Sequence, residues 1–128
     1  MSAPIIFISH KRVKEGMLDA FMQYYPEAIE ELKADKPGTL VHLAYASEDG
    51  RQLTVVQVLS DADAMDALMQ GAGERSKRMY EFTVTERLEI YGTPNPGVLE
   101  MMRKIAGSGV PLIYNPHFMD GYYHLSSG

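Results

Sequence analysis

The sequence predicts one α+β domain in which two helices pack on a four-stranded sheet, in the order β-α-β-β-α-β. Three observations predict this class. Short runs of β-branched and aromatic residues alternate with longer stretches whose apolar side chains recur every three or four positions. An Asp-Gly pair at residues 49–50, between two of the short runs, is typical of a tight hairpin. The length of 128 residues fits one domain and is too short for two of ordinary size.

The first strand is predicted over residues 4–13, where the apolar side chains are mostly β-branched or aromatic. A helix follows from Gly16 to about residue 34, with its apolar side chains on one face: Phe21, Tyr25, Ala28, Ile29 and Leu32. Pro26 lies inside this helix and has no N–H to donate, so we expect a kink or break near residues 24–25. Lys-Pro-Gly at residues 36–38 ends the helix.

The remaining core elements are three strands and a second helix. Residues 39–46 and 53–59 are predicted to be antiparallel strands joined by the hairpin, and residues 83–91 to be the last strand. The second helix lies between the third and fourth strands. Gly-Ala-Gly at residues 71–73 weakens it, so a separate short helix is expected over residues 74–80. This order of elements is the ferredoxin-like arrangement.

The segment Gly-Thr-Pro-Asn-Pro-Gly, residues 92–97, marks the end of this core, which we place at residues 1–92. Residues 93–128 are expected to be a C-terminal extension, too short to form a separate domain. Its pattern predicts a short amphipathic helix followed by a strand over residues 110–114. A turn at residues 120–121 would make a small hairpin with residues 122–123.

Composition excludes several classes of protein. The net charge is −5, with 12 Lys and Arg against 17 Asp and Glu, which argues against a nucleic-acid partner. The chain has no Cys, so disulfides, thiolate metal sites and a cysteine nucleophile are excluded. No segment approaches the roughly 18 apolar residues of a membrane span, and the first residues lack the pattern of a signal peptide. We therefore expect a cytoplasmic protein with no membrane partner.

Three of the four predicted strands are apolar on both faces. Two helices cover only one face of such a sheet, and an antiparallel sheet with a bare second face should be polar there. The second face therefore needs a cover. The sheet of a second copy of the chain is the simplest one, which predicts a homodimer, and the C-terminal extension is the competing cover.

The opening strand, the helix ended by Lys-Pro-Gly, the hairpin, the Asp-rich second helix and the last strand resemble the dimeric α+β barrel superfamily over residues 4–92. The antibiotic-biosynthesis-monooxygenase-like proteins are the most similar group within it. This resemblance implies a homodimer whose sheets pack face to face, with a cavity between each sheet and its own helices. It also implies activities such as cofactor-free oxygenation of aromatic polyketides, haem degradation or lactone isomerisation. A haem degrader needs an axial histidine on the second helix, and residues 61–82 contain none.

His10 and Arg87 are the candidate catalytic residues. His10 ends the first strand on the face of Ile6 and Ile8, where it is either a general base or a rim histidine. Regular alternation puts Arg87 on one face of the last strand, with Thr83, Thr85, Glu89 and Tyr91. There it would stabilise an enolate or phenolate, or it would pair with Glu89 on an exposed strand. The resemblance implies a partner aromatic on the second helix, and Tyr80 is the candidate.

A ligand cavity is predicted between the sheet and the helices, where Pro26 and residues 71–73 thin the helical cover. Its lining would include Tyr24, Tyr25, Met69 and Tyr80. His10 and Arg87 would share this cavity as its polar groups, and the extension around Asn115 and His117 would close it. His42, in the middle of a strand, is either a core residue or part of the cavity wall.

No metal and no cofactor are expected. The spacing of His117, Asp120 and His124 matches no metal signature, and dimer contacts or a lid explain this segment better. Two functions remain open. One is a cofactor-independent monooxygenase, or a related enzyme, for a small hydrophobic or aromatic molecule. The other is a ligand-binding or stress-related protein with the same cavity but no catalytic base.

Overall fold

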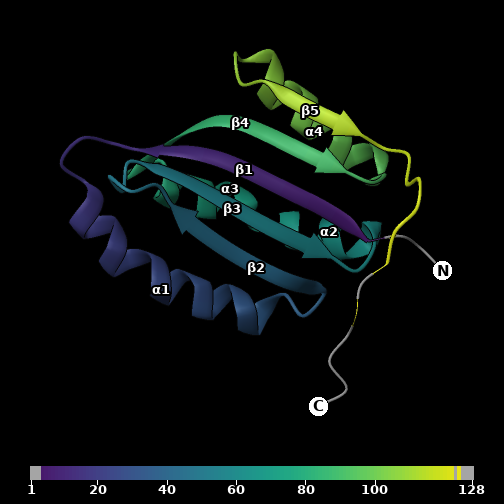
Figure 1. The fold of residues 1–128 in the computed structure, drawn as a ribbon, viewed down its shortest axis with the longest axis horizontal. Helices are drawn as coiled ribbons and strands as arrows, with labels where there is room; N and C mark the ends of the chain where they lie inside the picture. Colours follow the sequence, from purple (N-terminus) through teal and green to yellow (C-terminus); the bar gives the residue numbers. More distant parts are fainter. Residues whose placement is uncertain (1–3, 123, 125–128) are drawn as a thin grey trace.

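The structure, a computed structural model, describes residues 4–122 and residue 124. It confirms the predicted ferredoxin-like core and its order of elements (Figure 1). The core elements are β1 (Ile5–Val13), α1 (Leu18–Asp35), β2 (Thr39–Ala46), β3 (Gln52–Leu59), α2 (Ala62–Met69), α3 (Ala72–Met79) and β4 (Thr83–Tyr91). Two further elements follow, α4 (Pro96–Gly107) and β5 (Leu112–Asn115).

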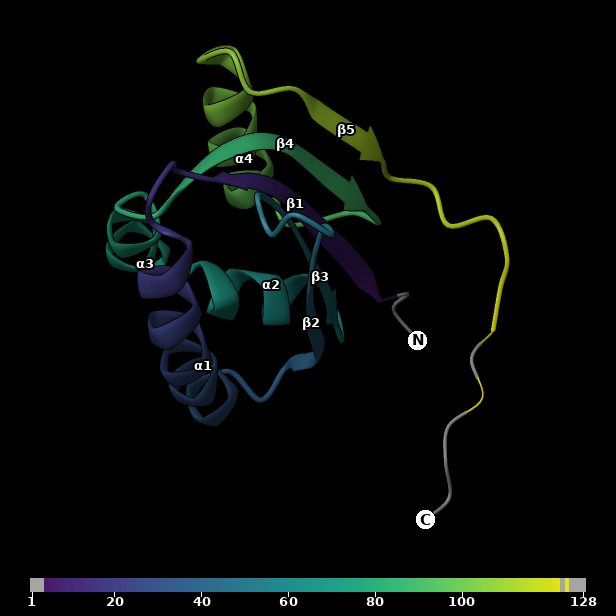
Figure 2. The ribbon, with the colours of Figure 1, turned by 60° about the vertical axis from the view of Figure 1, so that its left-hand side comes forward.

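The strands form one sheet in the order β2-β3-β1-β4-β5. All neighbours are antiparallel except β4 and β5, which run parallel at one edge. The helices lie on one side of this sheet, and Figure 2 shows that no helix covers the other side. We call these two sides the helix face and the open face.

Local chemistry explains where the helices begin and end. The second helical stretch divides as predicted, because α2 ends at Met69 and α3 begins at Ala72 after Gly71, whose φ is 79°. Asp61 begins α2 as its N-cap, with its carboxylate accepting from Ala64 N at 2.8 Å. The break predicted in the first helix is wrong. Helix α1 continues without interruption through the exposed Pro26, because an 18-residue helix with Phe21 buried in the core tolerates the loss of one hydrogen bond.

Alternation along β1 assigns each side chain to a face. Ile5, Phe7 and Ser9 are buried on the helix face, whereas Ile6 and Ile8 point to the open face and are only half-buried. The core on the helix face contains β1, β3 and β4 side chains packed on Met65 and Leu68 of α2 and on Val98 and Met102 of α4. Helix α4 therefore belongs to the same layer as the core helices.

A bulge in β4 changes the predicted alternation. His10 of β1 faces Arg87, but the next residue, Lys11, faces Thr85, so Glu86 is the extra residue. Thr83 and Thr85 therefore point to the helix face, whereas Arg87 points to the open face. The prediction that these side chains share one face is wrong, because regular alternation does not hold across a bulge.

The open face carries apolar side chains that nothing in the described part of the chain covers. Exposed residues on β2 and β5 contribute Val41, Leu43, Tyr45 and Ile113. Beyond β5, residues 116–122 continue without helix or strand on the open side of the sheet (Figure 2). The predicted hairpin is absent from residues 116–122, and its residue 123 lies outside the described part. No helix in the described residues is long and apolar enough to cross a membrane.

Candidate functional site

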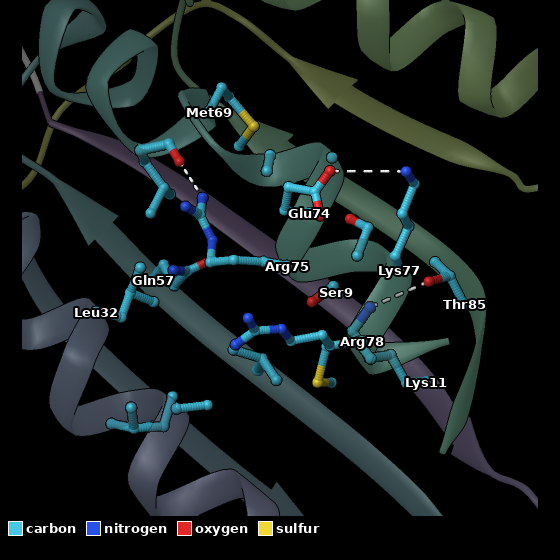
Figure 3. Close-up of a pocket in the computed structure, with 18 of the residues that line it drawn as sticks. Ser9, Lys11, Leu32, Gln57, Met69, Glu74, Arg75, Lys77, Arg78 and Thr85 are labelled. Carbon is cyan, nitrogen blue, oxygen red and sulfur yellow. Dashed lines mark hydrogen bonds and ion pairs between the residues drawn. The ribbon is translucent and has the colours of Figure 1, made fainter. Parts of the chain in front are cut away.

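A cavity of about 930 Å³ opens on the helix face, between α1 and α3 and above the central strands (Figure 3). Its floor comes from β1, β3 and β4, one wall from α1 and the other from the end of α2 and from α3. All four residues predicted to line it are in these walls: Tyr24, Tyr25, Met69 and Tyr80. Their role in binding a ligand stays a prediction.

The division between α2 and α3 helps to keep the cavity open. Gly73 lies in its wall, and a Cβ added there would meet nothing within 4 Å. The Arg75 side chain extends back to the end of α2. Its guanidinium donates to the carbonyls of Leu68 and of Gln70, the latter at 2.9 Å, so these donors are already used within the protein. These hydrogen bonds give a partner to carbonyl groups at the C-terminal end of α2 and link this end to α3.

Aromatic packing holds the α1 wall in place. Tyr24 stacks on Phe82 with ring centroids 4.9 Å apart, and Tyr25 packs against the buried ring of Phe21 at 5.1 Å. The Tyr25 hydroxyl is thereby held over the floor of the cavity. A rigid phenol is well suited to donate a hydrogen bond to a ligand.

Tyr25 is linked to a chain of polar groups that crosses from α1 to the sheet. The Gln57 side-chain amide, which is buried, donates to His42 Nδ1 at 3.1 Å. His42 Nε2 then carries the ring proton and donates it to the Tyr25 oxygen at 3.0 Å. This arrangement leaves the Tyr25 O–H free to donate into the cavity. Of the two interpretations left open for His42, the structure supports the cavity wall.

Burial keeps both members of this pair uncharged at neutral pH. It lowers the pKa of His42 below its usual range and raises the pKa of Tyr25 to about 12. The pair is thus a neutral imidazole that orients a neutral phenol. Its chemistry is hydrogen-bond donation to an oxygen that becomes negatively charged.

Ser9, Lys11 and Thr85 are polar residues on the cavity floor that sequence reasoning missed. Lys11 Nζ donates to Thr85 Oγ1 at 3.1 Å, and burial lowers the pKa of Lys11. Alternation along the strand puts Ser9 and Lys11 on the side of Ile5 and Phe7. The other side, with Ile6 and Ile8, is equally apolar, so the sequence carries no signal for which side the helices cover.

His10 and Arg87 lie side by side as expected, but on the open face, so the prediction that they share the cavity is wrong. His10 Nε2 contacts the Glu89 carboxylate, and Arg87 Nη2 lies 3.7 Å from the same carboxylate. Tyr91 donates its hydroxyl to Glu89 at 2.6 Å, and these contacts together lower the pKa of Glu89. The predicted pairing of Arg87 with Glu89 on the open strand face is what the structure contains.

Asn115 and His117 do not line the cavity, so the prediction that they close it is wrong. Asn115 ends β5, and its carbonyl accepts from Gly92 N at 3.0 Å across the sheet edge. The chain continues from there on the open side, away from α1 and α3 (Figure 2). Among the described residues, no group of three or more histidine or carboxylate side chains is placed to hold a metal ion, and this includes His117, Asp120 and His124.

Comparison with known proteins identifies the fold. The sequence matches no protein-family profile and no curated protein. Three solved structures share the fold. MupZ of Pseudomonas fluorescens has a TM-score of 0.72 at 18% identity, and the match covers 97% of this chain and 98% of MupZ. SnoaB of Streptomyces nogalater, a cofactor-independent oxygenase, has a TM-score of 0.58 at 16% identity, covering 72% of this chain and 94% of SnoaB. A presumed antibiotic biosynthesis monooxygenase of Bacteroides thetaiotaomicron has a TM-score of 0.58 at 21% identity, covering 72% and 90%.

These matches confirm the fold resemblance seen in the sequence, that of the antibiotic-biosynthesis-monooxygenase-like proteins. The MupZ match covers nearly the whole chain, so it extends well beyond residue 92 into the segment of α4 and β5. At these identities the likeness concerns the fold, and the chemistry has to be argued from the cavity.

Proposed function

We propose that this protein is a cofactor-independent monooxygenase, or a related enzyme, that acts on a small hydrophobic aromatic molecule in the cavity of the helix face. One observation carries the proposal. An otherwise largely apolar cavity of about 930 Å³ holds a cationic side chain, Lys11, and a phenol donor, Tyr25, on neighbouring walls. The shared fold with SnoaB, a cofactor-independent oxygenase, supports the same class of reaction.

The proposed reaction begins when an acidic phenol or enol ionises in the cavity. The Lys11 ammonium and the Tyr25 hydroxyl stabilise the anion that forms. The anion transfers an electron to O₂, and the two radicals combine as a hydroperoxide at an activated CH₂ carbon. Loss of water then leaves a carbonyl, so CH₂ and O₂ become C=O and H₂O. The substrate supplies all the electrons, so no external reductant is needed.

The chain's own residues position the substrate. Tyr24, Met69 and Tyr80 offer flat or polarisable apolar surface to an aromatic ring system. Gln57 and His42 hold Tyr25 as a donor, so they act as positioning residues for the reaction.

The working form is proposed to be a homodimer joined through the open face of the sheet. The exposed apolar side chains of β2, including Leu43 and Tyr45, support this arrangement, as do the half-buried Ile6 and Ile8 of β1. Residues 116–122 continue on the same side of the sheet (Figure 2), and the exposed side chains of this segment, Phe118, Met119 and Tyr122, would contribute to the interface.

Oxygen uptake tests the proposal. The probe is dithranol, a tricyclic dihydroxyanthrone whose central CH₂ is oxidised to C=O by one O₂. Chelator-treated protein should accelerate uptake above the protein-free rate, and Tyr25→Phe should lower kcat by at least about tenfold through loss of a donor. Tyr114→Phe is the matched control, since Tyr114 packs near Arg103 and does not line the cavity.

Two results would count against an enzyme. Saturable binding of dithranol without faster uptake would support the alternative, a ligand-binding protein with the same cavity. Uptake that requires an added metal would contradict the cofactor-independent reaction.

A further inference from the structure

Lys11 is a cation without a counter-ion in the cavity floor. Its Nζ donates to Thr85 Oγ1, and the described residues provide no carboxylate that forms an ion pair with it. Charged groups inside proteins are normally paired, because an unpaired charge removed from water is costly. The structure thus maintains a positive charge in an apolar cavity with nothing of its own to balance it.

Ser9 adds a hydrogen-bond donor without a partner beside that charge. The residue is only 6% exposed, it lines the cavity, and its hydroxyl forms no hydrogen bond with any residue that the structure describes. Its oxygen is open to the cavity, where a ligand can reach it. Ser9 precedes Lys11 by two positions on the same strand, so their Cα atoms are about 7 Å apart and their side chains point to the same face. Figure 3 shows both side chains in the cavity.

Thr85 completes the group from the neighbouring strand. The β4 bulge at Glu86 turns Thr85 to the helix face opposite Lys11. Its oxygen accepts from Lys11 Nζ, so its own hydrogen remains available to a ligand. Three side chains with hydrogens to donate therefore line the same part of the cavity floor, and no described carboxylate forms an ion pair with Lys11.

The other charged groups of the cavity do not supply the missing acceptor. Helix α1 contributes Glu27, Glu31 and Asp35, and none of them pairs with Lys11. On α3, Glu74 pairs with Lys77 at 3.6 Å. Arg75 is bound to backbone carbonyls of α2, and Arg78, the remaining cation of α3 in the lining, brings no negative charge. Among the described residues, none supplies a negative charge that pairs with Lys11.

We propose that Ser9, Lys11 and Thr85 form a subsite for an anionic oxygen of the ligand, a carboxylate or a phenolate. The protein then selects ionised aromatic ligands over neutral ones of the same shape. The inference rests on the proposed function, which places an aromatic ligand in this cavity with its anion at Lys11, and it adds Ser9, Thr85 and the preference for ionised ligands. Selection arises because an anion neutralises Lys11 and accepts from the two hydroxyls, whereas a neutral group leaves the charge unbalanced.

Binding of matched probes tests the subsite without any turnover. The full-length protein is titrated at pH 7 by calorimetry with 2-naphthoate and with 2-naphthamide, which has the same shape and no charge. The naphthoate should bind at least about tenfold more tightly. In Lys11→Met the preference should fall to within about twofold, and Ser9→Ala should give an intermediate loss.

Two further variants separate a charge effect from a folding effect. Lys11→Arg keeps the charge and should keep most of the preference for naphthoate. Lys104→Met removes an exposed lysine of α4 that does not line the cavity, so it lowers the net charge equally and should change nothing. Circular dichroism establishes that each variant is folded before it is titrated.

The second arm distinguishes a phenolate from a carboxylate ligand. The pKa of 4-nitrophenol should fall when it binds beside the Lys11 ammonium, so phenolate absorbance should grow at constant pH. Lys11→Met should abolish that growth. If only naphthoate responds to Lys11, the ligand is a carboxylic acid; if both respond, either anion fits. Equal binding of naphthoate and naphthamide, a preference that survives in Lys11→Met, or failure of both anions to bind would overturn the subsite. Oxygen uptake that persists with the subsite overturned would leave the proposed function standing.

Discussion

Replacing Lys11 with methionine should make the ligand-free protein more stable. The lysine keeps its charge partly buried and without a counter-ion, whereas methionine has a similar length and fills the same space without charge. Replacing a buried ion pair with apolar residues of similar volume is often neutral or stabilises a protein by about 1–4 kcal/mol, and Lys11 lacks even the ionic partner that offsets the loss of hydration. The variant also loses one hydrogen bond to Thr85, which contributes about 1 kcal/mol.

The free energy of unfolding of Lys11→Met should therefore exceed that of the wild type by about 1 kcal/mol. The gain is at the low end of the range because the open cavity leaves the ammonium partly hydrated. For a chain of 128 residues this corresponds to a rise in Tm of roughly 3–5 °C. Urea unfolding and calorimetry at pH 7 measure both quantities. Lys104→Met is the control, and as an exposed change it should stay within about 0.5 kcal/mol of wild type.

The gain should also depend on pH with a definite sign. Because the folded-state pKa of Lys11 lies below the ordinary 10.5, the unfolded chain binds more protons between the two pKa values. The wild-type protein therefore gains stability as the pH rises through that interval. The advantage of Lys11→Met should be largest at neutral pH and shrink toward pH 10.5. A variant destabilised by more than about 1 kcal/mol at pH 7 would refute the reasoning and give Lys11 a structural role.

Three further predictions concern other parts of the molecule. Leu43→Glu, on the open face where Leu43 is 47% exposed, should convert the proposed homodimer to a monomer with little loss of secondary structure. Light scattering measures the mass, and a variant that stays dimeric argues for another interface. Because burial lowers the folded-state pKa of His42, the unfolded wild-type chain takes up this proton first, and the wild type should lose stability as the pH falls below 6.5. His42→Asn should not show this loss, and identical pH profiles for variant and wild type would contradict the prediction. Gly92→Ala should cost at least about 1–2 kcal/mol in urea unfolding, because Gly92 has a φ of 112° and a Cβ there would lie 3.1 Å from Ile5; an unchanged midpoint would show that the strand edge relaxes.

The fold was largely predictable because the sheet and helices depend on short-range periodicity. Alternation at Ile5 to Ile8 and the Asp-Gly turn are visible within a few residues. The break between α2 and α3 followed from glycine chemistry at residues 71–73. Pro26 is the exception, because proline removes one hydrogen bond and α1 keeps the others, with Phe21 buried in the core.

The position of the cavity was predictable, but its polar groups were not. The positions of Tyr24, Tyr25 and Tyr80 in the cavity lining follow from the helical periodicity of the sequence. Which face of β1 the helices cover is decided by the whole topology, and alternation alone assigns His10 and Lys11 to opposite faces without saying which is which. The contact of Tyr25 with His42 joins two elements, and the bulge that turns Thr85 toward Lys11 leaves no mark in the sequence pattern.

We expect the ligand to bind on the helix face, in the cavity, and not at the polar cluster of His10, Arg87 and Glu89 on the open face. A crystal structure of the protein with 2-naphthoate decides between the two places. The ring system should lie between Tyr24, Met69 and Tyr80, with the carboxylate within hydrogen-bond distance of Lys11 Nζ and Ser9 Oγ. A naphthoate bound beside Arg87 on the open face, with the cavity holding only water, would contradict it.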